Sequence, residues 1–266
     1  MSYEAELAFA TDTAREAGKI MLEYFRSDKI DTEWKQDNSP VTIADKTINE
    51  MLIDRAKETF PDHGVLGEEL SNYPERQRIW VVDPIDGTVP FSIGMPLSTF
   101  SLALVDRSDG QPLVGVTYDP FLDELYYATK GGGAFCNDVA IHTSEATELN
   151  RGLVGLTGGR LENLPDYYDP GLATNAIRNA GARNMGFASF VYLSNRIAKG
   201  QLLGSIIGKA GAWDIAASSL IVREAGGVVT DLTGKPRRFD EVDMGCMHAA
   251  NPEIHKKLME LMNNGQ

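Results

Sequence analysis

The chain has 266 residues, of which 42% are hydrophobic and 24% charged, and a formal net charge of −13 at pH 7. Such a composition is typical of a globular protein with one large or two modest domains. The acidic balance argues against a nucleic acid polymer or an anionic membrane as partner, because both need clustered Lys and Arg. Cys136 and Cys246 lie far apart, which favours reduced thiols, and we see neither a signal peptide nor a membrane-spanning run, so we expect a cytoplasmic protein.

The N-terminal half is expected to start with two helices and continue as short strands. Apolar residues at three-and-four spacing from Leu7 to Tyr24 predict the first helix, which Ser2 could cap. The second helix should begin near Thr42, with Asp45 at a capping-box-like spacing, and end before Pro61. Beyond it, short β-type runs separated by turn-rich segments predict an antiparallel meander. These runs are Trp80–Val82, Thr99–Val105, Leu113–Tyr118, Leu125–Thr129 and Gly133–Cys136.

After about residue 145 the pattern alternates between strands and helices. The expected strands are Leu153–Leu156, Leu202–Ile207, Val228–Asp231 and Cys246–Ala249. The expected helices are Leu172–Asn179, Ser189–Ala198, Asp214–Ala225 and Pro252–Met262. We therefore expect an α+β half followed by an α/β half, with no linker between them.

The segment Trp80–Thr88 reads as an apolar strand that ends in acidic residues. Asp83 closes the strand, Pro84 fixes the backbone after it, and Asp86-Gly87 predicts a sharp turn. Two carboxylates three residues apart on such a turn can point into the same space, and magnesium prefers oxygen ligands. The NH groups after Asp86 would point outward, where they could hold phosphate oxygens. Taken alone, the segment is equally consistent with a plain β-turn.

Other acidic positions also have ordinary structural explanations when each is taken alone. Glu68-Glu69 is typical of a solvated loop, Asp214 stands where a helix N-cap is expected, and Asp45 fits the capping box already described. These separate explanations do not account for the order in which the acids occur around Asp-Pro-Ile-Asp-Gly-Thr.

This order, together with Trp-Asp-Ile-Ala-Ala at 213–217, resembles the inositol monophosphatase family of magnesium-dependent, lithium-sensitive phosphatases over nearly the whole chain. The resemblance implies a layered αβαβα sandwich, with an antiparallel-sheet N-terminal half and an α/β C-terminal half, and commonly a homodimer. We expect an α+β domain over residues 1–145 that carries most metal ligands. An α/β domain over residues 146–266 would carry Asp214 and the substrate pocket.

The resemblance also implies two or three Mg²⁺ ions. One would be held by Glu68, Asp83 and the backbone carbonyl of Ile85, and a second by Asp83, Asp86 and Asp214. A third, weaker ion would lie near Glu68, mostly in water. Metals at such a site can lower the pKa of a water and stabilise a departing alkoxide, so no covalent nucleophile is needed.

Around the metals, Thr88 and Asp45 resemble the pair that orients and deprotonates the attacking water. Glu69 resembles a supporting acid beside the metal shell. Lys35 matches a lysine that the family places near the phosphate, and backbone NH groups of Gly87 and Thr88 would bind that phosphate.

The substrate pocket is where this sequence departs from the family pattern. In inositol-specific members, a Gly-Thr-Ala-Ala-like run and a Glu seven residues before the Trp-Asp aspartate contact the inositol hydroxyls. Here the run is Gly186-Phe187-Ala188-Ser189, and Ile207 holds the place of the Glu. Because Ile cannot accept a hydrogen bond, this position argues against myo-inositol. Ile207→Glu should then improve the use of polyhydroxylated substrates.

The sequence thus predicts a magnesium-dependent phosphomonoesterase that acts on a small polyol or sugar-like phosphate by means of a metal-activated water. Histidinol phosphate and other sugar or nucleotide phosphates stay open as substrates. A non-catalytic metal- or phosphate-binding regulator on the same fold is the alternative of another class.

Overall fold

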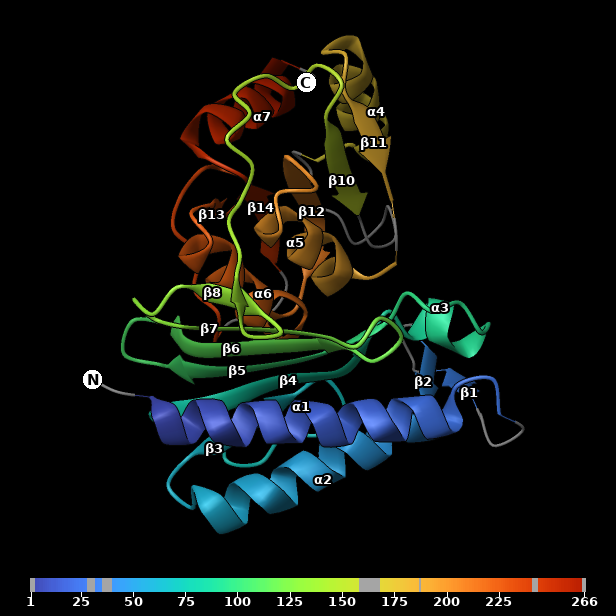
Figure 1. The fold of residues 1–266 in the computed structure, drawn as a ribbon, viewed down its shortest axis with the longest axis vertical. Coiled ribbons are helices and arrows are strands. Elements are labelled where there is room, and N and C mark those ends of the chain that lie inside the picture. The colour runs from blue at the N-terminus through green and yellow to red at the C-terminus, as the bar shows by residue number, and fades with distance from the viewer. Residues whose placement is uncertain are drawn as a thin grey trace.

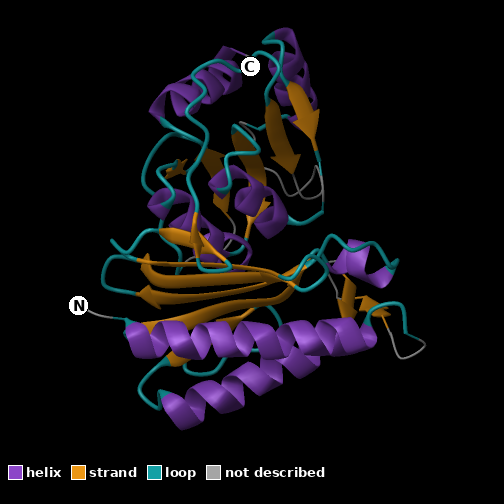
Figure 2. Ribbon diagram, in the orientation of Figure 1, coloured by secondary structure: helices purple, strands orange, loops and turns teal. Residues whose placement is uncertain are grey.

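The computed structural model describes residues 3–27, 32–34, 40–157, 168–186, 188–240 and 244–264. Helices and sheets alternate in layers (Figure 1): α1 and α2, a large sheet, α5 and α6, a second sheet, then α4 and α7. Figure 2 shows the same order by type of secondary structure. This is the predicted αβαβα sandwich. No helix in the described ranges is long and apolar enough to cross a bilayer.

The first half of the chain forms the lower two layers. Its elements are α1 (Glu4–Tyr24), β1 (Thr32–Trp34), β2 (Pro40–Thr42), α2 (Ile43–Thr59), β3 (Gly64–Gly67), β4 (Arg78–Asp86), α3 (Thr88–Ser92), β5 (Thr99–Asp106), β6 (Gln111–Asp119), β7 (Glu124–Thr129), β8 (Ala134–Cys136) and β9 (Val139–Ala140). The large sheet has the order β3-β4-β5-β6-β7-β8-β9. Strands β4 to β9 pair antiparallel in chain order, which confirms the predicted meander, and β3 joins β4 in parallel.

The second half forms the other layers. Its elements are β10 (Leu153–Thr157), α4 (Pro170–Asn179), β11 (Arg183–Met185), α5 (Phe190–Ala198), β12 (Gly204–Ala210), α6 (Ala212–Glu224), β13 (Val228–Thr230), β14 (Met244–Ala249) and α7 (Pro252–Asn264). The sheet order is β11-β10-β12-β14-β13, with parallel pairing of β10 to β11 and β12 and antiparallel pairing of β14. Although the two sheets take their strands from either side of residue 145, the domain boundary there stays a prediction.

The helix α1 packs on the large sheet through the stripe that the sequence predicts. Ala10, Ala14, Ala17 and Met21 are fully buried in one core cluster with residues of α2 and of the sheet. Burial of a side chain such as Met contributes about 1.5–3 kcal/mol relative to exposure. The expected capping residue Ser2 lies outside the described residues.

The helix α6 occupies the middle layer and is buried on nearly all sides, as expected for a helix that is apolar all round. Its Ala217 lies so close to Gly115 of β6 that a Cβ at Gly115 would stand 2.7 Å from the Ala217 carbonyl oxygen. Contacts with both sheets therefore fix the start of α6, which carries Asp214.

Candidate active site

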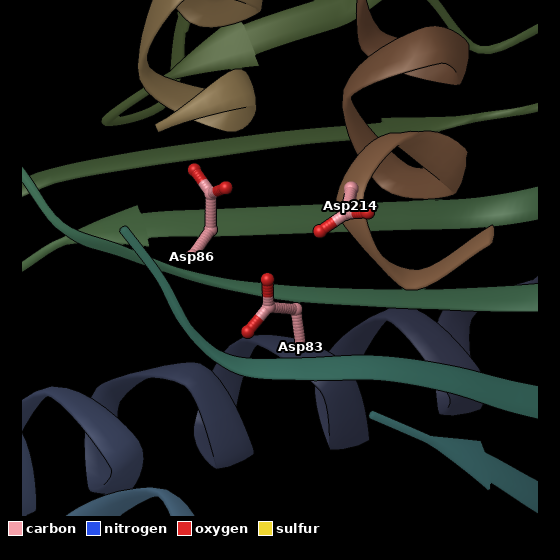
Figure 3. Close-up of side chains that lie close together, drawn as sticks. All are labelled: Asp83, Asp86 and Asp214. Carbon is pink, nitrogen blue, oxygen red and sulfur yellow. The ribbon is translucent and has the colours of Figure 1, made fainter. Parts of the chain in front are cut away.

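Three aspartates from distant parts of the chain converge in one place (Figure 3). Asp83 and Asp86 come from the end of β4, and Asp214 from the first turn of α6. One carboxylate oxygen of each lies within 4.8 Å of the others. Asp83 is only 2% exposed and Asp86 3%, while Asp214 is half-buried. This is the geometry of a group that can hold a metal ion.

A bulge in β4 places Asp83 and Asp86 on the same side of the sheet. In a regular strand, residues three apart point to opposite faces. Here Asp83 pairs with Ser101 and Asp86 with Thr99, so three steps on β4 match two steps on β5. The extra residue restores a common direction, and Pro84, which has no NH for the ladder, lies within it. The expected turn is thus one residue later: β4 runs through Asp86, and the chain turns at Gly87.

Gly87 turns the chain into α3 with φ 88°, in the left-handed region that glycine favours. A Cβ at this position would stand 3.0 Å from the carbonyl oxygens of Ala188 and Leu97. Both the backbone conformation and the space around it therefore require glycine. The turn brings the first NH groups of α3 to the rim of the aspartate cluster, where they lack partners within the helix.

Asp214 also serves the helix that carries it. Its Oδ2 accepts a hydrogen bond of 2.5 Å from the NH of Gly211, the residue before α6. Asp214 is thus the third residue of the helix, and the N-cap is Gly211, one turn earlier than predicted. One oxygen satisfies the helix end, and the side chain still reaches the cluster.

Asp45 and Thr88 meet beside the cluster. Asp45 is fully buried at the start of α2, and its Oδ2 accepts hydrogen bonds from the NH of Thr42 at 2.8 Å and from the Thr42 hydroxyl at 2.5 Å. This confirms the predicted capping box. Oδ1 faces the Thr88 hydroxyl at 3.5 Å, and that hydroxyl lies 3.1 Å from the Ile85 carbonyl oxygen. The capping role and a role in the site are therefore compatible.

A cavity of about 110 Å³ opens over the cluster. Its lining combines carboxylates with apolar groups. The lining residues are Pro40, Glu68, Asp83, Ile85, Asp86, Gly87, Thr88, Val89, Ala188, Phe190 and Asp214. The predicted acid Glu68 thus joins the three aspartates at one cavity.

The crowding of acids raises the pKa values in the site. Burial raises the pKa of Asp83 and of Asp214 well above the ordinary range, and the neighbouring charges of Glu68 and Asp86 raise both further. Burial also raises the pKa of Asp86 to about 6, against hydrogen bonds from Ser189 and other donors that lower it. A divalent cation among these groups would reverse the effect, because it favours the charged form. The donor set therefore fits a hard cation such as Mg²⁺.

Asp45 titrates in a similar setting. Burial raises its pKa to about 7, the two hydrogen bonds from Thr42 lower it, and the charges of Glu68 and Glu69 raise it. Glu69 is half-buried next to Glu68 and acts on Asp45 through its charge. A carboxyl group with a pKa near neutrality can accept a proton at physiological pH.

Some predicted pocket residues lie elsewhere. Ile207 of β12 is 0% exposed and belongs to the core cluster between the two sheets, and it is not among the described residues that line the cavity. Its side chain is part of the core, and its expected contact with substrate stays a prediction. Gly186 is exposed, and Ala188 lines the cavity. Lys35 and Phe187 lie outside the described residues.

Sequence reasoning missed several groups at the site. The apolar wall of the cavity consists of Pro40, Val89, Ala188 and Phe190, of which only Ala188 was expected at the site. Ser189 and Thr99 donate hydrogen bonds to Asp86. For Ser189 a signal existed, since serine directly before an apolar helix is typical of an N-cap.

Comparisons with known proteins point the same way. The profile described as "Inositol monophosphatase family" matches residues 2–266. A relative from Pasteurella multocida, named Nus factor SuhB, is 35% identical over 260 residues, which cover 95% of this chain and 94% of that protein. A histidinol-phosphatase from Chlorobaculum parvum is 32% identical over 262 residues, 98% of each chain. The solved structure of a Thermotoga maritima IMPase has a TM-score of 0.86 and 29% identity, with 98% of this chain and 97% of that one covered.

Proposed function

Because this chain belongs to the inositol monophosphatase family, whose members are metal-dependent phosphoric monoester hydrolases, we propose that it hydrolyses a small polyol or sugar-like phosphate with Mg²⁺. The observation that carries the proposal is the convergence of Asp83, Asp86 and Asp214 within 4.8 Å at a cavity that Glu68 also lines. The four carboxylates at this cavity would repel a phosphate ester, and bound cations would invert the local field.

We propose two or three ion sites built from these groups. Glu68, Asp83 and the Ile85 carbonyl would hold one ion, and Asp83, Asp86 and Asp214 a second. A third would lie near Glu68. Bound Mg²⁺ would supply charge neutralisation of the phosphate and a water of lowered pKa.

The chain's own residues would orient and deprotonate that water. Asp45 keeps Oδ2 on Thr42 and turns Oδ1 to the hydroxyl of Thr88, which lines the cavity, so the buried carboxylate would act on the water through Thr88. Glu69 would support this role by raising the pKa of Asp45 through its charge. The NH groups of Gly87 and Thr88 would hold phosphate oxygens, as the start of a helix favours anions. Lys35 would add a positive charge near the phosphate.

The leaving group would lie against the apolar wall. Val89 is 46% exposed at the cavity, and Ala188 and Phe190 complete that side. This wall favours a second substrate class, histidinol phosphate, because an aromatic ring such as imidazole packs well on Phe190. The similarity to a histidinol-phosphatase supports this candidate. Other sugar or nucleotide phosphates remain candidates on the same cavity.

A function of another class has support as well. One relative is named Nus factor SuhB and not phosphatase, which is the support for our alternative proposal of a non-catalytic metal- or phosphate-binding regulator on this fold. Such a protein would bind metal without turnover. The Asp45–Thr88 pair favours catalysis, because a binding protein does not need a group that takes a proton from water.

We further propose a cytoplasmic homodimer, which light scattering after size exclusion would test.

A substrate panel tests the enzymatic proposal. Inositol phosphate, histidinol phosphate, a sugar phosphate and a nucleotide phosphate would be compared by released phosphate, with Mg²⁺ and with EDTA. We expect Mg²⁺-dependent release from at least one of them. Asp214→Asn is the matched control, because asparagine keeps an oxygen for the NH of Gly211 but loses the charge that holds the ion. Metal binding without release from any ester would favour the regulator.

A further inference from the structure

The carboxylate of Asp86 is held by the start of α5, an element of the other half of the chain. Its Oδ1 accepts a hydrogen bond from the NH of Phe190 at 3.0 Å, and its Oδ2 one from the NH of Val191 at 2.9 Å. The hydroxyl of Ser189 also donates to Oδ2, and that of Thr99 does so at 3.3 Å. Among the described residues, three donors thus bond Oδ2 and one bonds Oδ1.

Ser189 uses its single hydroxyl for two purposes. It caps α5 by accepting a hydrogen bond of 3.2 Å from the NH of Tyr192, and it donates a hydrogen bond to Asp86. The residue is 0% exposed, so water does not compete for either bond.

We propose that Ser189 is a positioning residue that sets the Mg²⁺ affinity of the site formed by Asp83, Asp86 and Asp214. The inference rests on the proposed metal site. A carboxylate oxygen that accepts three hydrogen bonds has little remaining capacity, so Oδ1 becomes the oxygen that faces the cluster. The hydroxyl fixes the rotation of the carboxylate that achieves this. Partners that orient a metal ligand in this way typically change metal affinity 10–100-fold when they are removed.

The same contacts join the proposed metal site to the apolar wall of the cavity. Phe190 and Ala188, on either side of Ser189, line the cavity. The position of the apolar wall therefore depends on the same carboxylate that would hold the ion. An ion at Asp86 and a leaving group at Phe190 would be aligned by one short segment of backbone.

The test is the dissociation constant of Mg²⁺, measured by calorimetry on the whole EDTA-treated protein without substrate. Ser189→Gly is the main variant, because glycine is nearly as good an N-cap as serine but lacks the hydroxyl. We expect its dissociation constant to rise 10–100-fold. Ser189→Thr keeps the hydroxyl and should bind within about threefold of wild type. Ser189→Ala gives a second hydroxyl-free variant should the glycine variant fail to fold.

A cap at a distance from the site separates affinity from stability. Asp169 caps α4 through bonds to the NH groups of Gly171 and Leu172 at 2.7 and 3.1 Å. Asp169→Ala should lower Tm by about 2–4 °C and leave the Mg²⁺ constant unchanged. Folded Ser189→Gly or Ser189→Ala protein that binds Mg²⁺ within threefold of wild type overturns the inference alone. Wild-type protein that binds no Mg²⁺ overturns the metal site and the inference together.

Discussion

Replacement of His248 should remove a large part of the pH dependence of stability. His248 lies on β14 and is fully buried, with Nδ1 2.8 Å from the Ser194 hydroxyl of α5 and Nε2 2.8 Å from the Ser219 hydroxyl of α6. Burial and, to a smaller extent, the charges of Arg223 and Arg237 together lower its pKa from 6.5 to about 3. The folded protein therefore keeps this imidazole neutral at pH values where the unfolded chain protonates it.

The magnitude follows from these two pKa values. Between pH 6.5 and 3 the unfolded state binds more protons than the folded state at this site, so the free energy of unfolding falls as the pH falls. At pH 5 the pH is about 1.5 units below the pKa of the unfolded imidazole, which lowers the free energy of unfolding by about 2 kcal/mol. Above pH 6.5 the cost vanishes, because the imidazole is neutral in both states.

The assay is urea unfolding of wild type and His248→Asn at pH 7.5 and at pH 5, in EDTA. The variant should lose stability at both pH values, because asparagine is shorter than histidine and leaves at least one of the two serine hydroxyls without its partner. The difference between the two proteins should shrink by about 2 kcal/mol at pH 5, since only the wild type carries the histidine. Effects of the aspartate cluster cancel, because both proteins contain it. An equal difference at the two pH values would refute the reasoning.

The remaining predictions concern the site and its surroundings. Gly87→Ala should lower the free energy of unfolding by about 1–3 kcal/mol, because alanine is strained at φ 88° and meets two carbonyl oxygens; a thermal melt checks this. Mg²⁺ should raise Tm more at pH 8 than at pH 5.5: the metal-free fold loses stability as the pH rises through the raised pKa of Asp86, about 6, and of Asp45, about 7. Equal gains at both pH values would contradict this. Ile207→Glu should destabilise the protein by about 3 kcal/mol or more, since it buries an unpaired charge. Improved turnover of polyhydroxylated substrates in a stable variant would contradict this and support the predicted role of Ile207 in the substrate pocket.

The sequence predicts local elements well where periodicity and burial agree. The alanine stripe of α1 and the run of strands from β4 to β8 follow directly from apolar spacing. The pair of β1 and β2 was missed, because strands of three residues are too short to show an alternating pattern. The short helix α3 was missed for a related reason, since five residues are too few to show a period.

The candidate site divides in the same way. The acids could be named from their order along the chain, yet regular strand geometry would have placed Asp83 and Asp86 on opposite faces. Only the pairing with β5 shows the bulge that unites them. Ile207 shows the converse: it occupies the right place in the sequence, but the direction of its side chain depends on how β12 packs against the core. The order of the acids along the chain was thus enough to name the aspartates that converge, whereas the direction of the other side chains depends on tertiary packing.

The middle position of α6 has a consequence for how the molecule could be divided. Asp83 and Asp86 belong to one sheet, whereas Asp214 starts a helix that is clamped between that sheet and the next. A fragment that stops before α6 would retain two of the three aspartates, and the complementary fragment only one. Binding of an ion by all three aspartates would thus require that the two fragments reassemble, so ion binding could serve as a measure of their association.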